Sequence, residues 1–189
     1  MNNAIGGAGY FLVTVLFNLA TFAFLVRFIL QAVRADFYNP ITQGIVRLTD
    51  PVLRPLRRLI PSAGGLDLAA LLVAILLQML AILLFTSGAS IVTVLLVSAF
   101  KLLSLVLDIY FWALVVIVII SWVAPGTYNP AAALLQQITE PLLAPFRRLI
   151  PPVGGLDFSV MVAFLVLIVI RDYLLPGLLL EVGLNPGLL

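Results

Sequence analysis

The sequence predicts an all-α membrane protein with four transmembrane helices, arranged as two parallel two-helix repeats. Of its 189 residues, 63% are apolar and 10% are charged, whereas soluble domains average about 45–50% apolar and about 25% charged residues. The apolar residues gather in four long runs, and one thirteen-residue motif occurs twice, as PLRRLIPSAGGLD and PFRRLIPPVGGLD. One soluble core of this size cannot bury so much apolar surface, so we expect the lipid bilayer to surround the chain.

The four apolar runs set the expected spans. A helix needs about 20 residues, at about 1.5 Å each, to cross the hydrocarbon core. The fourth run is interrupted by Arg171 and Asp172, and we expect Pro176-Gly177 to end its helix. The predicted spans cover residues 10–33, 67–86, 102–123 and 156–176.

The internal repeat divides the chain in two. Between residues 38–67 and 128–157, sixteen of thirty positions are identical at a constant offset of 90. This indicates a duplication, with residues 1–90 as the first repeat and 91–189 as the second. Each repeat holds two spans, so the loops 34–66 and 124–155 are expected on the same side of the membrane.

The basic residues predict which side that is. Seven of the ten lie in the two loops: Arg34, Arg47, Arg54, Arg57, Arg58, Arg147 and Arg148. Short loops rich in Lys and Arg face the cytoplasm. We therefore expect cytoplasmic loops and both termini on the periplasmic or external side.

Both loops have the pattern of amphipathic helices in the membrane interface. In the first loop, Ile41, Ile45 and Leu48 follow helical spacing, with polar residues on other faces. Acidic residues precede Pro51 and Pro141, so we expect Asp50 and Glu140 to cap new short helices there. Proline four residues later should kink or end these helices, at Pro55 and Pro145.

The loop arginines are the main binding candidates. Two interpretations are open: they clamp a phosphate, a lipid head group or an acidic partner segment, or they set topology and anchor the interface. The duplicated proline pattern favours more than topology, because orientation needs charge and not geometry. The candidate anion-, lipid- or partner-binding residues are Arg54, Arg57, Arg58, Arg147 and Arg148.

The end of each motif predicts a turn followed by a helix cap. The glycine pairs either allow close approach of a ligand or form a tight turn into the membrane; they are Gly64, Gly65, Gly154 and Gly155. Asp67 and Asp157 directly precede apolar helices. We expect each to be an N-cap, compatible with a salt bridge to an arginine of its own loop.

Polar residues within the spans form a second candidate group. Counted from the cytoplasmic helix ends, they fall at similar depth, roughly one turn (about 6 Å) inside the outer surface: Asn18, Asp108, Arg171 and Asp172. A charge in hydrocarbon costs about 2.5–3.5 kcal/mol on insertion scales. We expect Asp108 to pair with Arg171; the alternative is that both reach the nearby interface.

Catalysis has little support in the sequence. The chain has no Cys and no His, which excludes disulfides, Cys/His zinc sites and haem ligation by His. It also lacks a nucleophile–base arrangement and a phosphate-binding glycine loop. We expect a protein that is not an enzyme, holds no cofactor and does not bind nucleic acid directly.

The motif resembles the YggT family, whose relatives include the YlmG proteins. The resemblance rests on Asp36-Phe37-Tyr38-Asn39-Pro40 and on the two thirteen-residue copies, and it covers nearly the whole chain. It implies a bacterial inner-membrane protein linked to osmotic-stress tolerance through potassium uptake. Relatives are linked to cytochrome complex maturation and to plastid division. One departure is that Arg54 of the first copy corresponds to Ala144 of the second.

These observations lead to one expected function and two alternatives. We expect a scaffold or assembly factor that holds another inner-membrane protein or an anionic lipid at its basic cytoplasmic face. The alternatives are a component of a potassium transport system, acting as a homo-oligomer, and a lipid-binding or membrane-shaping module.

Overall fold

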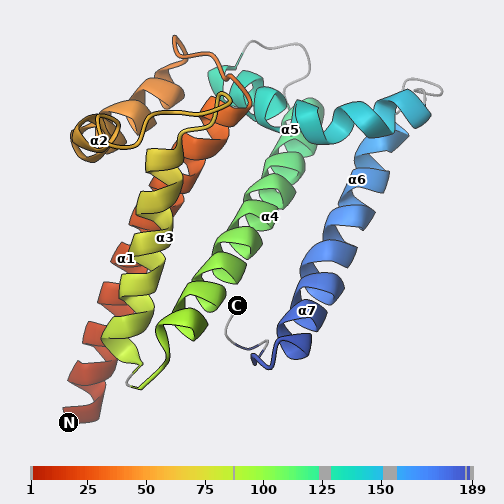
Figure 1. Cartoon of the computed structure of the whole chain (residues 1–189). Coiled ribbons are helices and arrows are strands. Elements are labelled where there is room, and N and C mark those ends of the chain that lie inside the picture. The colour runs from red at the N-terminus through yellow and green to blue at the C-terminus, as the bar shows by residue number, and fades with distance from the viewer. Residues whose placement is uncertain (1, 87, 124–128, 151–156, 186, 188–189) are drawn as a thin grey trace.

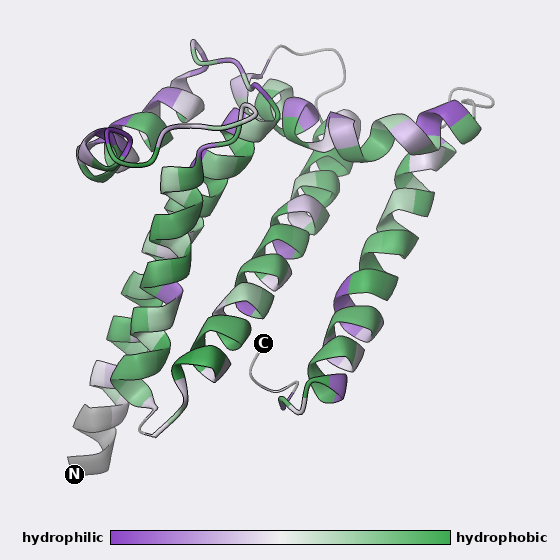
Figure 2. Cartoon of the chain, in the orientation of Figure 1, coloured by the Kyte–Doolittle hydropathy of each residue, from purple (hydrophilic) through white to green (hydrophobic). Residues whose placement is uncertain are grey.

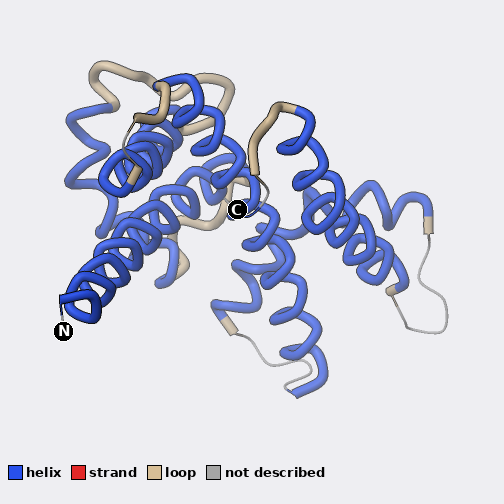
Figure 3. Tube along the Cα trace, turned by 90° about the horizontal axis from the view of Figure 1, so that it is seen from below, coloured by secondary structure: helices blue, strands red, loops and turns tan. Residues whose placement is uncertain are grey.

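The computed structural model of the chain describes residues 2–86, 88–123, 129–150, 157–185 and 187. These residues form helices and loops, with no β-strand in the described ranges (Figure 3). The helices are α1 (Asn2–Ala32), α2 (Pro40–Leu56), α3 (Leu68–Phe85), α4 (Ile91–Val123), α5 (Pro130–Leu149), α6 (Phe158–Ile168), the π-helical η1 (Val169–Leu174) and α7 (Leu175–Glu181).

Four helical segments are long and apolar enough to cross a membrane. They are Gly7–Ala32 within α1, all of α3, all of α4, and the continuous α6–η1–α7 segment Phe158–Glu181. They form the apolar columns of Figure 2, and most of the hydrophilic residues gather at one end of them. The predicted all-helical, four-span membrane class is confirmed.

Helices α2 and α5 lie across the same end of the four spans (Figure 1). Each starts at the same motif: Asn39 and Asn129 are the N-caps, and Pro40 and Pro130 take the first helical position. Proline suits that position because its missing N–H has no partner there in any case.

The new helices expected at Asp50 and Glu140 do not form. Helix α2 continues through Pro51 and Pro55, and α5 continues through its two matching prolines. In α2, the prolines remove the donors to the carbonyls of Arg47 and Pro51. Both residues are exposed, so water can satisfy these carbonyls and the helix persists.

Two of the spans are longer than the sequence indicated. Helix α4 begins at Ile91, eleven residues before the expected start, and Lys101 lies within it without interrupting it. Lysine is a good helix former, so a single charge does not end a helix. Nor does Pro176 end the last span, since α7 continues to Glu181. The π turns of η1 end at Leu174, two residues before Pro176, and they include the residue four positions before it, whose carbonyl its ring would meet in a regular α-helix.

Two apolar clusters hold the helices together, and α5 contributes to both. The first joins α1 and α3 and includes Leu134 and Ile138 of α5. The second joins α4 to α6 and α7 and includes Leu143, one turn further along α5. Helix α5 therefore connects the two halves of the molecule at the end where α2 also lies.

Candidate functional site

The first motif forms an ion-pair network that fixes α2 to the start of α3. Arg57 Nη2 lies 2.5 Å from Asp67 Oδ2, and Arg57 Nη1 lies 3.5 Å from Asp50 Oδ1. Asp67 is 0% exposed and is the N-cap of α3, accepting a hydrogen bond from the N–H of Ala70. An unpaired buried carboxylate costs free energy, and the ion pair with Arg57 offsets that cost for Asp67.

The second motif repeats the network. Arg147 Nη1 lies 2.5 Å from Glu140 Oε2, and Arg147 Nε lies 3.0 Å from Asp157 Oδ2. Asp157 is the N-cap of α6 and accepts hydrogen bonds from the N–H and the hydroxyl of Ser159. Asp50 and Glu140, which precede Pro51 and Pro141, are therefore partners of arginines and not helix caps.

The titration of Asp157 reflects these contacts. Partial burial acts to raise the pKa of its carboxyl, but the hydrogen bonds from Ser159 and Arg147 outweigh burial and hold that pKa below its ordinary value. For Arg147, burial acts to lower the pKa, and the two carboxylates raise it above its ordinary value. Both shifts favour the charged pair.

The networks divide the candidate arginines into two groups. Arg57 and Arg147 are held by carboxylates, and Arg54 lies 3.0 Å from Asp50. Arg58 and Arg148 are exposed, and no carboxylate of the described residues pairs with either. Of the two adjacent arginines in each motif, the second is therefore the one that no described carboxylate holds, and it can bind an outside anion.

A leucine follows each available arginine and is also exposed. Leu59 is 80% exposed and Leu149 is 79% exposed. A large apolar side chain beside a cation is typical of segments in the lipid interface. Arg58, Leu59, Arg148 and Leu149 are called the arginine–leucine surface below.

The glycines of the first motif form a tight turn. Gly64 and Gly65 have φ angles of 62° and 86°. Ala63 and Leu66 exchange backbone hydrogen bonds across them, at 3.2 and 3.0 Å. Positive φ at both central residues is typical of a type I′ turn and favours glycine. The matching Gly154 and Gly155 lie outside the described residues.

A contact between the halves has no signal in the sequence. The side-chain amide of Asn39 donates a hydrogen bond to the carbonyl oxygen of Pro130, at 2.7 Å. Next to it, the backbone N–H of Asp36 donates to Gln137 Oε1, at 2.8 Å. Asn39 is buried, whereas its counterpart Asn129 is exposed and makes only its own cap hydrogen bond among the described contacts. The two copies of the motif thus differ in role.

Within the spans, the expected pair forms between α4 and the last span. Arg171 Nε lies 2.8 Å from Asp108 Oδ1, and its guanidinium lies 5.0 Å from the ring centre of Phe111. Arg171 Nε is also 3.6 Å from Asp172 Oδ1. Because α4 starts earlier than predicted, Asp108 lies near the middle of this helix, and its depth in the membrane stays a prediction.

Asn18 does not join this pair. It lines a different cavity, together with Gln78 and Lys101. The four polar residues predicted as one cluster therefore belong to two sites, because α1 packs against α3 and not against the last span.

The Asp108–Arg171 pair borders an apolar groove of about 670 Å³. Side chains of α1, α2, α4 and α5 line it, including Phe22, Ile45 and Trp112. Among the described lining residues, the pair supplies the charges. The groove thus offers an apolar surface and not a polar path for ions.

Arg27 is a buried charge on α1. It is 5% exposed, and its guanidinium lies 5.3 Å from the ring centre of Phe37. Its Nε and Nη1 atoms have no hydrogen-bond partner among the described residues. A cation–π contact therefore holds this arginine at the junction of α1 with the α2 segment. The described part of the chain contains no group of three Asp or Glu residues that could hold a metal ion.

Four apolar spans with amphipathic helices across one end define a multi-pass α-helical membrane protein. The chain belongs to the CCB3/YggT family, whose family model matches residues 7–88 and, a second time, residues 96–178. The two matches follow the internal repeat in the sequence.

Relatives from bacteria and a plant are similar to this chain. The uncharacterized protein PA0392 of Pseudomonas aeruginosa is 48% identical over 94% of this chain and 93% of its own length. The uncharacterized protein YggT of Escherichia coli K12 is 39% identical over 89% of this chain and 95% of its own. The chloroplastic YlmG homolog protein 2 of Arabidopsis thaliana is 44% identical over 32% of this chain and 24% of its own. No solved structure matches the chain.

Proposed function

We propose that this protein is a non-enzymatic scaffold or assembly factor of the bacterial inner membrane. Its arginine–leucine surface binds an acidic segment of another membrane protein or anionic lipid head groups. The observation that carries the proposal is that Arg58 and Arg148 are exposed and, unlike Arg57 and Arg147, have no carboxylate partner in the described part of the chain.

The surrounding structure supports binding at a fixed position. Arg57 and Arg147 tie the C-terminal ends of α2 and α5 to the spans that follow. Each available arginine is therefore the neighbour of an anchored residue. Preorganised donors lose less entropy when they bind, and two such points at one end suit an extended acidic segment or a lipid surface.

The charge distribution supports the proposed orientation. Seven of the ten basic residues lie in the two segments at the α2–α5 end. By the positive-inside rule, this end is cytoplasmic and both termini are periplasmic. Two sequence repeats with two spans each then have the same orientation.

The test is extraction into polymer-bounded membrane discs without detergent, followed by mass spectrometry of retained proteins and lipids. We expect a protein partner or anionic lipid to be retained by the wild type and by R58K/R148K, and to fall about tenfold in R58Q/R148Q, since charge-assisted contacts are lost. Equal retention by the glutamine variant would overturn the proposal. Loss of lipid alone, with no protein partner, would favour the membrane-shaping alternative.

The ion-transport alternative has less support. Asp108 is neutralised by Arg171, and the groove beside the pair is apolar. That alternative would be established if proteoliposomes that contain this protein as a homo-oligomer show a potassium flux and D108N abolishes it. The proposed link to osmotic-stress tolerance is tested with a deletion strain that is complemented with R58K/R148K or with R58Q/R148Q. The measurement is growth of these strains at high salt.

A further inference from the structure

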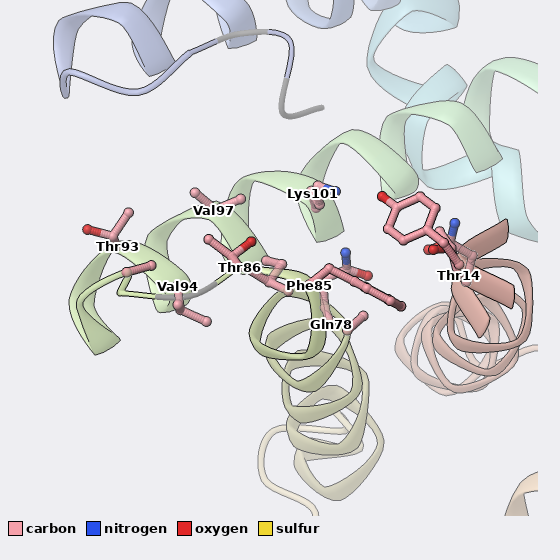
Figure 4. Close-up of a pocket in the computed structure, with 13 residues that line it drawn as sticks. Thr14, Gln78, Phe85, Thr86, Thr93, Val94, Val97 and Lys101 are labelled. Carbon is pink, nitrogen blue, oxygen red and sulfur yellow. The ribbon is translucent and has the colours of Figure 1, made fainter. Parts of the chain in front are cut away.

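A polar cavity lies among the spans at the end away from α2 and α5. It has a volume of about 250 Å³ and is enclosed by the N-terminal part of α1, the C-terminal part of α3 and the N-terminal part of α4. Figure 4 shows Thr14, Gln78 and Lys101 entering it from these three helices. Its polar lining residues include Thr14, Asn18, Gln78, Thr86, Thr93 and Lys101.

The side chains that line this cavity favour an anion. Lys101 supplies a positive charge, and the described lining contains no carboxylate. Two side-chain amides, three threonine hydroxyls and the hydroxyl of Tyr10 add hydrogen-bond donors. Gln78 is 6% exposed, and Thr14 Oγ1 is buried without a hydrogen-bond partner among the described residues. Buried polar groups normally have partners, so the unpartnered hydroxyl of Thr14 indicates an absent ligand atom.

The position of Lys101 strengthens this inference. It lies within the span α4, and no ion pair with a described acidic residue satisfies it. Among the other charges in the spans, Asp108 and Arg171 pair with each other, and Arg27 lies over the ring of Phe37. Charged residues within spans are functional-site candidates, because a charge in a membrane helix is expected to have a partner.

The rest of the lining indicates that the ligand is an amphiphile. Phe85, Val94 and Val97 make apolar walls. Tyr10 and Phe85 stack edge to face at the cavity with ring centres 4.4 Å apart, and both are exposed on the helix surface. Aromatic residues of this kind lie at the depth of lipid head groups. A lipid reaches such a cavity by lateral diffusion, whereas a free anion must leave water.

We propose that this cavity binds the phosphate head group of an anionic phospholipid in the leaflet opposite α2 and α5. Lys101 pairs with the phosphate, Gln78 and Asn18 donate hydrogen bonds to the head group, and an acyl chain lies along the apolar wall. The site is not duplicated: the positions that match Gln78 and Thr14 in the second half are Ile168 and Ser104. One lipid per chain is therefore expected in this cavity.

Native mass spectrometry of protein released from nanodiscs tests this proposal. The nanodiscs contain phosphatidylcholine alone or mixed with phosphatidylglycerol. We expect one phosphatidylglycerol to be retained by the wild type and by K101R, and about tenfold less by K101Q, since a charge-assisted contact is lost. Q78L keeps the charge but loses the amide, so it should also retain less lipid.

Controls separate this site from the arginine–leucine surface. R58Q/R148Q should keep the phosphatidylglycerol that depends on Lys101, even where it loses lipid from the arginine–leucine surface, because its changes lie in the segments at the other end of the spans. Lipid retention is compared only among variants whose melting temperatures match that of the wild type. If K101Q does not fold, Q78L takes its place in the comparison. Equal retention by wild type, K101Q and Q78L would overturn the proposal, as would equal retention of phosphatidylcholine. If inorganic phosphate raises the melting temperature of the protein as much as phosphatidylglycerol does, the ligand is a small anion and not a lipid.

Discussion

The side-chain amide of Asn39 donates a hydrogen bond to the carbonyl oxygen of Pro130, 91 residues further along the chain. Its oxygen accepts from the N–H of Ile41 and so caps α2. One side chain therefore starts an interfacial helix and also fixes it to the start of α5. Asn129, at the matching position, caps α5 without a second described contact.

This difference predicts unequal effects of the same substitution. Loss of an N-cap costs about 1 kcal/mol, and loss of a buried hydrogen bond costs about 1 kcal/mol more. Asn129→Ala should therefore destabilise the protein by about 1 kcal/mol and Asn39→Ala by about 2 kcal/mol. Thermal unfolding in detergent, followed by circular dichroism, measures both. Equal losses would show that the contact between halves contributes nothing.

The adjacent arginines of the first motif should also behave differently. Arg57→Gln leaves the buried carboxylate of Asp67 without its charged partner, and breaking such a pair costs about 3–5 kcal/mol. Arg58→Gln changes an exposed residue and should alter stability by less than about 0.5 kcal/mol. The comparison uses the same residue change one position apart. A stability loss in R58Q that matches R57Q would contradict the assignment of their roles.

The Asp108–Arg171 pair predicts a partial rescue. Either single neutralisation, D108N or R171Q, leaves one charge among the spans, which costs about 2.5 kcal/mol on insertion scales. The double variant D108N/R171Q removes both charges and should recover more than half of that loss. Chemical unfolding of all three variants gives the coupling energy. Additive losses would mean that each side chain reaches the interface separately.

Asp157 predicts a loss of stability in acid. Its folded-state pKa lies below the ordinary 3.8, so its contribution is present above that value. Stability is lost as the pH falls through 3.8 and towards the lower folded pKa, because the unfolded chain binds the proton more tightly. Melting temperatures from pH 7 down to acid should fall less steeply for D157N than for the wild type. Parallel curves would rule out this contribution.

The same glycine-to-alanine change at two positions should have opposite effects on stability, because one position requires positive φ and the other lies in a helix. Gly65 has φ of 86° in the tight turn, so Gly65→Ala should cost about 1–2 kcal/mol. Gly44 lies within α2, and no atom is within 4 Å of where its Cβ would be. Gly44→Ala should stabilise by about 0.5–1 kcal/mol. Stabilisation of the protein by both substitutions would show that the turn does not require positive φ.

The amino-acid sequence alone determined the class of this protein and its repeated unit. Apolar runs long enough to cross a bilayer indicate spans in any tertiary arrangement, since the cost of polar backbone in lipid leaves few alternatives. The motif copies at an offset of 90 determined where the amphipathic segments lie. The aspartates before α3 and α6 were predicted as caps because capping is local.

Tertiary structure decided which residues are free to act. Arg57 and Arg58 are neighbours in an identical pair, yet one is held by carboxylates seven and ten residues away and the other is exposed. Asn18 and Asp108 match in the repeat, but helix packing places them at different sites. Such assignments depend on distances between helices, which no local pattern encodes. For the same reason, the cavity at Lys101 emerges only when α1, α3 and α4 are placed together.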